Sequence, residues 1–244
     1  MTEREDLRRI AIVPAYNEEA CIGQVLDEIR EFDPGLSVVV IDDGSIDRTA
    51  QVARDRGAHV LKLPFNLGIG GSVQTGFRYA WENGYELAVR VDGDGQHDPS
   101  QLAVIIGPVL AEEADICVGS RYRERGDGFR SSAPRRIGIR ILAATVSLLT
   151  RQKVTDPTSG FQALNRKAIT LFAADYPHDY PEVEALVMLI RHRLRLKEVP
   201  VQMRPRAAGR SSIRAFGSVY YMVKVLLALF VGSFRRNVVP LEDA

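Results

Sequence analysis

The sequence predicts an α/β fold with a mostly parallel sheet that is flanked by helices on both faces. Short apolar runs alternate with helix-forming segments over the first 120 residues of the 244-residue chain. Repeated βα units are typical of parallel sheets, because each crossover helix covers one face. Polar and glycine-rich motifs follow the first, second and fourth runs. Since ligands bind at the carboxyl ends of parallel strands, we expect all three motifs to face one crevice.

The first part of the chain should contain five strands and four helices. Asn17, followed by two glutamates, has the form of a helix cap and first turn, and Pro99 suits the first turn of a later helix. The expected strands are Ile10–Val13, Leu36–Ile41, His59–Leu63, Leu87–Val91 and Ile116–Gly119. The expected helices run from Asn17 to Glu31, from Ser45 or Asp47 to Arg56, from Gly70 to Asn83, and from Pro99 to Leu110.

After Gly119 the regular alternation ends. We expect arginine-rich loops at 120–136 and 204–214, a turn and short strand at 155–165, and a strand at Arg195–Val199. Helices are expected at Ile137–Leu149, Glu182–Arg193 and Ser218–Phe234. No repeat or low-complexity linker divides these parts, which predicts one domain over residues 1–215 and a C-terminal helical extension over 216–244.

Composition indicates a soluble globular protein, with 45% hydrophobic and 26% charged residues. Cys21 and Cys117 are interpreted as reduced core residues of a cytosolic protein, and the charged start of the chain argues against a signal peptide. Residues 1–100 contain 10 Lys and Arg against 18 Asp and Glu, whereas residues 101–244 contain 22 against 13. This asymmetry predicts a metal-binding and an anion-binding half, unless it reflects solvated faces only. The sequence contains no stripe of basic residues with interleaved aromatic residues, so we do not expect a nucleic acid as partner.

The segment VRVDGDGQHDPS at 89–100 is the strongest chemical signal. Asp92 and Asp94 lie one residue apart at a strand end, so their carboxylates share a face and repel each other unless a cation lies between them. Hard divalent cations prefer oxygen ligands and accept diphosphate oxygens as well. An EF-hand loop would need Gly at His97 and Glu at Ala103, so that reading fails. An Asx-rich turn is the alternative, and His97 is expected to hydrogen-bond locally.

Two other motifs suit a nucleoside. In DDGSIDRT, Asp42 and Asp43 follow a strand directly and can accept from a ribose hydroxyl or a base N–H. In PAYNEE, Pro14 fixes a turn, Tyr16 can pack on a base, and Glu18 can accept a hydrogen bond. The glycine-rich segment FNLGIGGSVQTG, which includes Gly68, lacks the P-loop and dinucleotide patterns, so we expect it to pack beside the nucleotide.

Taken in order, PAYNEE, DDGSIDRT, NLGIGGSVQTG, DGDGQHD, GSRY and TDPTSGF resemble family-2 glycosyltransferases of the Rossmann-like GT-A fold. The resemblance covers roughly residues 8–215 and is strongest to the dolichyl-phosphate mannose synthase and polyprenyl-phosphate glycosyltransferase group. It implies that Pro14, Tyr16, Glu18, Asp43 and Gly68 lie around the nucleoside. It also implies that Asp92, Asp94 and Gln96 hold Mg²⁺ or Mn²⁺ on the diphosphate, with Asp-Gly-Asp replacing the usual Asp-Ala-Asp.

The resemblance further implies an acceptor side rich in arginine. Arg121, with Arg135 or Arg136, matches arginines near an acceptor phosphate, and Arg206 and Arg210 lie in a loop like one that closes over the donor diphosphate. The loop with Asp156, Ser159 and Gly160 matches the floor of the site.

The implied activity is metal-dependent inverting transfer of a sugar from a nucleotide-diphosphate sugar to a polyprenyl or dolichyl phosphate. A lipid phosphate oxygen is already anionic and needs no base. A sugar hydroxyl, as in polysaccharide, glycolipid or cell-wall synthesis, would need one, and Glu182, Glu184 or Asp156 would then be the candidate. A sugar nucleotidyltransferase is an alternative, but it should carry a glycine- and arginine-rich loop where PAYNEE stands. A second alternative is a protein that binds a sugar nucleotide without catalysing a reaction.

The C-terminal apolar stretch Val225–Phe234 is too short to span a bilayer, which needs about 20 residues. Lys224 and Arg235-Arg236 flank it. Such a helix suits the core, an interface in a homo-oligomer, or a membrane surface. We therefore expect a cytoplasmic enzyme. If the C-terminal helix lies on a membrane surface, the enzyme is expected to be peripheral at the inner face of the membrane.

Overall fold

Seven strands and seven α-helices make up the part of the chain that the computed structural model describes, which is residues 7–122, 133–178, 180–205, 224, 225 and 227. The strands are β1 (Arg9–Ala15), β2 (Ser37–Asp42), β3 (His59–Lys62), β4 (Leu87–Arg90), β5 (Ile116–Ser120), β6 (Gln162–Asn165) and β7 (Leu196–Pro200). The helices are α1 (Ile22–Phe32), α2 (Thr49–Asp55), α3 (Gly68–Glu82), α4 (Leu102–Leu110), α5 (Ala133–Thr150), α6 (Arg166–Ala174) and α7 (Pro181–Arg191), with a 3₁₀ turn at Pro99–Gln101 before α4.

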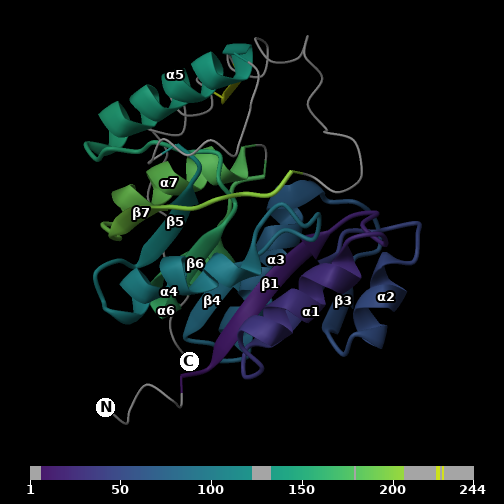
Figure 1. The fold of residues 1–244 in the computed structure, drawn as a ribbon. Coiled ribbons are helices and arrows are strands. Elements are labelled where there is room, and N and C mark those ends of the chain that lie inside the picture. Colours follow the sequence, from purple (N-terminus) through teal and green to yellow (C-terminus); the bar gives the residue numbers. More distant parts are fainter. Residues whose placement is uncertain (1–6, 123–132, 179, 206–223, 226, 228–244) are drawn as a thin grey trace.

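The strands form one sheet in the order β3-β2-β1-β4-β6-β5-β7 (Figure 1). Strand β6 runs antiparallel to both β4 and β5, and the other neighbours pair in parallel. The sheet is therefore mostly parallel, as predicted. The reversal at β6 was not predicted, because a four-residue strand carries no direction in its sequence.

Both faces of the sheet are covered, so its strands are apolar on both sides. In β1 the side chains of Ile10 and Ile12 join one core with α3, α5, α6 and α7. Those of Ala11 and Val13 join a second core with α1, α2 and α4. All four side chains are fully buried, as the alternation of a central parallel strand requires.

The predicted start of the first helix is wrong. Helix α1 begins at Ile22, because Asn17 adopts a left-handed conformation with φ 55° and binds another loop instead of capping a helix. Its main-chain N–H donates to the Ser45 hydroxyl at 2.9 Å, and its side-chain oxygen accepts from the Ile46 N–H at 3.0 Å. Tertiary hydrogen bonds thus override a sequence pattern that is typical of a cap.

Two helices on the other side of the sheet also differ from expectation. Helix α6 was not predicted; Asn165 caps it by accepting from the N–H of Ala168 at 3.1 Å. Helix α5 begins at Ala133, inside the segment that was expected to be a loop. In the remaining elements the strand and helix types are confirmed, with ends that shift by a few residues.

Most of the predicted C-terminal extension falls outside the described residues, as does most of the basic loop at 204–214. Lys224, Val225 and Leu227 are helical, and Val225 is fully buried in the core that contains α3. No helix within the described ranges has the length and apolarity that crossing a membrane requires. Cys21 and Cys117 are both buried and form no disulfide, as predicted.

Close packing of α3 on β1 gives a first prediction. A methyl group at Gly76 would collide with the Cγ2 atom of Ile12, so Gly76→Ala should lower the free energy of unfolding by about 1–3 kcal/mol. The control is Gly107→Ala in α4, where the new methyl meets no atom within 4 Å. This control should be neutral or stabilising by up to about 1 kcal/mol. Urea unfolding that ranks the two variants equally would contradict the packing.

Asp115 gives a second prediction, because it joins the ends of β5, β6 and β7. Burial alone would raise its pKa, but hydrogen bonds from the Arg195 side chain and main chain and from Asn165 lower it to about 2. A lowered pKa stabilises the fold above the unfolded value of about 4, and this stabilisation is lost as the pH falls towards 2.

Asp115→Asn should therefore cost about 2 kcal/mol near neutral pH, and the difference from the wild type should shrink by about 1 kcal/mol at pH 3. Urea titrations at pH 7, 5 and 3 measure it. A difference that stays constant with pH would argue against the ionised carboxylate as the cause.

Candidate active site

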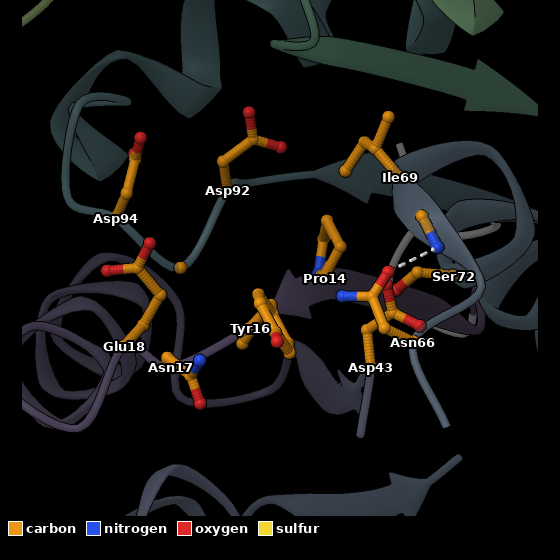
Figure 2. A pocket seen from close by; sticks show the side chains of 13 residues that line it. Pro14, Tyr16, Asn17, Glu18, Asp43, Asn66, Ile69, Ser72, Asp92 and Asp94 are labelled. Atoms are coloured by element: carbon orange, nitrogen blue, oxygen red, sulfur yellow. Dashed lines mark hydrogen bonds between the residues drawn. The ribbon is translucent and has the colours of Figure 1, made fainter. Parts of the chain in front are cut away.

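A cleft of about 730 Å³ opens at the carboxyl ends of β1, β2 and β4 (Figure 2). The strand order reverses there, since β2 and β3 continue on one side of β1 while β4 lies on the other. The lining residues are Pro14, Ala15, Tyr16, Asn17, Glu18, Asp43, Asn66, Gly68, Ile69, Ser72, Asp92, Gly93 and Asp94. The three motifs and the glycine-rich segment therefore meet in one crevice, as predicted.

The segment after β1 is held against the loop after β2. Besides the bonds of Asn17, the main-chain N–H of Glu18 donates to the Thr49 hydroxyl at 2.8 Å. The ring of Tyr16 is 46% exposed and lies in the middle of the cleft wall in Figure 2. Pro14 lies beside it, and the Glu18 carboxylate points towards the loop after β4. An exposed ring next to carboxylates is suited to packing on a base.

Asp43 links the loop after β2 to the start of α3. Its Oδ1 atom accepts from the Leu67 N–H at 2.7 Å, and the side chain is only 4% exposed. Burial raises the pKa of Asp43, and hydrogen bonds from the main chain at Leu67 and Gly68 partly oppose this rise. Gly44, at φ 74°, packs so tightly on Phe65 that a Cβ would lie 2.8 Å from its carbonyl carbon.

Sequence reasoning missed three lining residues near the start of α3. Asn66 accepts from the Gly68 N–H at 2.9 Å beside the start of α3, which begins two residues earlier than expected. Ile69 is 41% exposed at the cleft, and Ser72 is buried there with no hydrogen-bond partner for its hydroxyl among the described residues. A serine within a helix gives no signal for such a place in the sequence.

Asp92 and Asp94 lie on the same side of the cleft, on the loop that follows β4 (Figure 2). Between them the N–H of Gly93 donates to the carbonyl of Pro14 at 3.1 Å, and a Cβ at Gly93 would approach the Ala15 side chain to 3.1 Å. Glycine therefore lets the ends of β4 and β1 come close together. Asp94 is 7% exposed and accepts from the Gln96 N–H at 3.0 Å.

The two carboxylates fit a cation that is shared with a substrate. No group of three or more His, Cys, Asp or Glu side chains within the described ranges is arranged to hold a metal ion. Mg²⁺ commonly takes one or two carboxylates and completes its shell with water and phosphate oxygens. Asp92 and Asp94 match that chemistry. Gln96 does not line the cleft, and its main chain orients Asp94 instead.

His97 is a hydrogen-bonding residue, as predicted. Its Nδ1 atom accepts from the Asp92 N–H at 2.9 Å, and its ring packs on Phe161 with the ring centroids 5.0 Å apart. Burial lowers the pKa of His97, so the ring is neutral, and with Nδ1 as acceptor its proton is on Nε2. His97 thus supports the loop that carries both aspartates.

Arg90 is the most conspicuous residue that sequence reasoning missed. It is 1% exposed at the end of β4, where its Nε atom donates to Asp92 Oδ1 at 3.0 Å and its Nη2 atom donates to Glu182 Oε1 at 2.9 Å. Burial would lower the pKa of Arg90, but the two carboxylates raise it, so it stays charged. The available signal was an arginine inside the apolar run LAVRV.

Arg121 also lies beside a carboxylate. Its Nε and Nη2 atoms donate to the two Asp156 oxygens at 2.6 and 2.8 Å, and Nη2 also donates to the Thr158 hydroxyl at 2.8 Å. The Glu198 carboxylate accepts from the main chain of Asp156, and the Ser159 hydroxyl donates to the Gly119 carbonyl. The loop TDPTSGF is therefore tied to β5 and β7.

The other predicted arginines are less informative. Arg121 does not line the cleft described above. Arg135 and Arg136 belong to the first turn of α5, and Arg206 and Arg210 lie outside the described residues. The structure thus brings the predicted nucleoside and metal residues together, with Gln96 behind them, whereas a cluster of arginines remains a prediction.

Comparison with known proteins agrees with this geometry. The sequence model of Glycosyl transferase family 2 matches residues 10–172. The UDP-N-acetylglucosamine–dolichyl-phosphate N-acetylglucosaminyltransferase of Methanococcus voltae is 28% identical over 210 residues, which are 78% of this chain and 83% of the relative. The polyprenol monophosphomannose synthase of Mycolicibacterium smegmatis is 29% identical over 234 residues, which are 92% of this chain and 88% of the relative.

A solved structure shows the same fold. Glucosyl-3-phosphoglycerate synthase of Mycobacterium tuberculosis, in complex with Mn²⁺, UDP and glucosyl-3-phosphoglycerate, superposes with a TM-score of 0.70 at 24% identity. The match covers 93% of this chain and 80% of that one. Together with the family match, which spans most of the sheet and the whole cleft, this shows that the protein belongs to glycosyl transferase family 2 and is a glycosyltransferase of the GT-A fold, related to polyprenyl-phosphate sugar transferases.

Proposed function

We propose that this enzyme transfers a sugar from a nucleotide-diphosphate sugar to a polyprenyl or dolichyl phosphate, with Mg²⁺ or Mn²⁺ and with inversion at the sugar. The names of the Methanococcus and Mycolicibacterium relatives support a lipid phosphate as acceptor. In the reaction, a bond forms between the acceptor phosphate oxygen and the anomeric carbon, and the bond from that carbon to the donor diphosphate breaks. The nucleoside diphosphate leaves with the electron pair.

The observation that carries the choice of acceptor is the state of the candidate bases. Glu182 accepts from the buried Arg90, and Asp156 is held at both oxygens by Arg121. The oxygens that accept these hydrogen bonds are already occupied by arginines, which competes with a role in taking a proton from a substrate hydroxyl. A sugar hydroxyl needs a base to take its proton, whereas a lipid phosphate is already anionic. The pairing of Glu182 and Asp156 with arginines therefore favours the phosphate, and Glu184, in the first turn of α7, is the remaining candidate base for a hydroxyl acceptor.

The cleft residues then have distinct roles. Tyr16, Glu18 and Asp43 bind the nucleoside, with Pro14 and Gly68 shaping the wall around it. Asp92 and Asp94 hold the metal ion, which when bound offsets the charge of the leaving diphosphate. Gln96 orients Asp94 through its main-chain N–H.

The acceptor side is assigned to the basic second half of the chain. Arg121 lies near the acceptor phosphate, and Arg206 and Arg210 close over the donor diphosphate. We propose that the C-terminal segment 216–244 serves as a subunit interface or as the contact with the membrane surface where a lipid acceptor is found, while Val225 packs in the core. The excess of 22 Lys and Arg over 13 Asp and Glu after residue 100 supports this orientation towards anions.

A transfer assay tests the acceptor and the donor together. The purified protein is incubated with Mn²⁺ or Mg²⁺, undecaprenyl or dolichyl phosphate, and a panel of labelled GDP-, UDP- and dTDP-sugars. We expect label from one donor to enter the lipid phase only when metal is present. Transfer to a glycan hydroxyl, with none to lipid phosphate, would refute the proposed acceptor. Release of pyrophosphate would indicate a nucleotidyltransferase instead.

The metal role is tested with Asp94→Asn, which keeps the shape of the side chain and removes its charge. We expect kcat/KM for the donor to fall by at least about 100-fold, because an electrostatic contact to the leaving group is lost. The control is Asp55→Asn, the same change on the exposed end of α2. Equal activity of the two variants, at unchanged melting temperatures, would rule Asp94 out of the metal site.

A further inference from the structure

We propose that Arg90 is a positioning residue that fixes the Asp92 carboxylate towards the cleft, and that Glu182 serves as the partner of Arg90 and not as a base. The inference rests on the proposed function in one respect, namely that Asp92 belongs to the cation and diphosphate site. Arg90 is not among the residues that the sequence motifs single out, although its partners Asp92 and Glu182 are.

Burial of the Arg90 charge is costly. A guanidinium with 1% exposure at the end of an apolar strand is far less favourable than a leucine there, unless it is paired and hydrogen-bonded. Buried ion pairs seldom stabilise a fold more than well-packed apolar residues of similar size. A charge at this place therefore indicates a role in the orientation of its partners.

Arg90 lies between two carboxylates that are themselves partly exposed, with 29% of the Asp92 side chain and 20% of the Glu182 side chain accessible. The main chain of Asp92 is anchored as well, because its N–H donates to Nδ1 of His97. Nε2 of that ring lies 3.8 Å from Asp92 Oδ2, which is beyond hydrogen-bond distance. Arg90 therefore orients the carboxylate by a direct hydrogen bond, and His97 orients the main chain that carries it.

The surroundings of Arg90 fit a guanidinium group. A Cβ at Gly160 would lie 2.8 Å from the Cζ atom of Arg90, so the TDPTSGF loop passes directly over the planar group. Only a planar fork can donate to Asp92 through Nε and to Glu182 through Nη2 at once. A lysine would keep the charge but could not reproduce this pair of bonds.

The ion pairs of Arg90 connect two distant segments of the chain. Asp92 follows β4 in the nucleotide-binding part, whereas Glu182 begins α7, 90 residues later in the chain. Through Arg90, helix α7 is fixed relative to the carboxylate that faces the cleft. Outer partners of this kind set the affinity of a metal site, and their removal commonly weakens it by about 10- to 100-fold.

The test uses Arg90→Lys and Glu182→Gln in the full chain. The control pair is Arg78→Lys and Glu82→Gln, which change an exposed arginine–glutamate pair on α3 that is joined by a bond from Nε to Oε1 at 3.0 Å. Titration with Mn²⁺ in the presence of UDP or GDP measures binding, and the transfer assay gives kcat as a function of pH. Thermal unfolding verifies that each variant is folded.

We expect Arg90→Lys to weaken Mn²⁺-dependent nucleotide binding by about 10- to 100-fold and Glu182→Gln by about 10-fold, with no change in the control pair. In Glu182→Gln the shape of the pH profile of kcat should match that of the wild type. Glu182→Gln remains decisive if Arg90→Lys does not fold, because Gln keeps the shape and an acceptor oxygen.

Other outcomes would overturn the proposal in distinct ways. Normal Mn²⁺ binding by both variants would show that Arg90 does not position Asp92. Normal binding by Glu182→Gln, with transfer abolished and the acid limb of the pH profile gone, would make Glu182 a base. If the wild type binds nucleotide without any dependence on Mn²⁺, both this inference and the metal role fail. Transfer to a hydroxyl acceptor with the expected binding changes would refute the proposed acceptor alone.

Discussion

The close approach of the carboxyl ends of β1 and β4 is the constraint on which the rest of the site depends. The N–H of Val91 and that of Gly93 donate to the carbonyls of Ile12 and Pro14, so the parallel pairing continues beyond the last residue of β4. A side chain in place of Gly93 would press on Ala15 and Ile22. The aspartates on either side of Gly93 thereby face the same space as Tyr16, and the cleft exists because two strand ends are kept in register there.

Partly exposed ion pairs join distant parts of the chain. Arg204 donates to Glu28 at 2.6 Å and to Asp98 at 2.8 Å, so a cation of the second half neutralises two acids of the first. Part of the positive charge of the second half is therefore neutralised within the molecule by acidic residues of the first half. The rest of the basic charge in the second half stays consistent with an anionic acceptor.

Much of the fold and of the donor side could be predicted from the sequence, because these depend on local patterns. Apolar β-branched runs specify buried strands, and polar residues at the ends of β1, β2 and β4 converge wherever such strands are parallel. The direction of β6, the cap formed by Asn165 and the left-handed turn at Asn17 could not be predicted, since each depends on partners that are distant in the chain or on hydrogen bonds that compete with a local pattern. The same holds for Arg90, whose partner Glu182 carries no mark of the pairing in its own segment.

The reversed strand β6 has a consequence for how the chain comes together. On the donor side, β1, β2 and β3 are neighbours both in the sequence and in the sheet, so their pairing closes short loops. On the other side, β4 pairs with β6 and β5 pairs with β7 across long stretches of chain, and such contacts carry a larger entropic cost and slow the search for the native state. The loop TDPTSGF enters β6 directly, so its position depends on the same long-range pairing that joins the two parts of the sheet. The cleft shares this kinetic cost on one side, because its wall after β4 rests on the pairing of β4 with β1, whereas its wall after β2 is built from segments that are close in the chain.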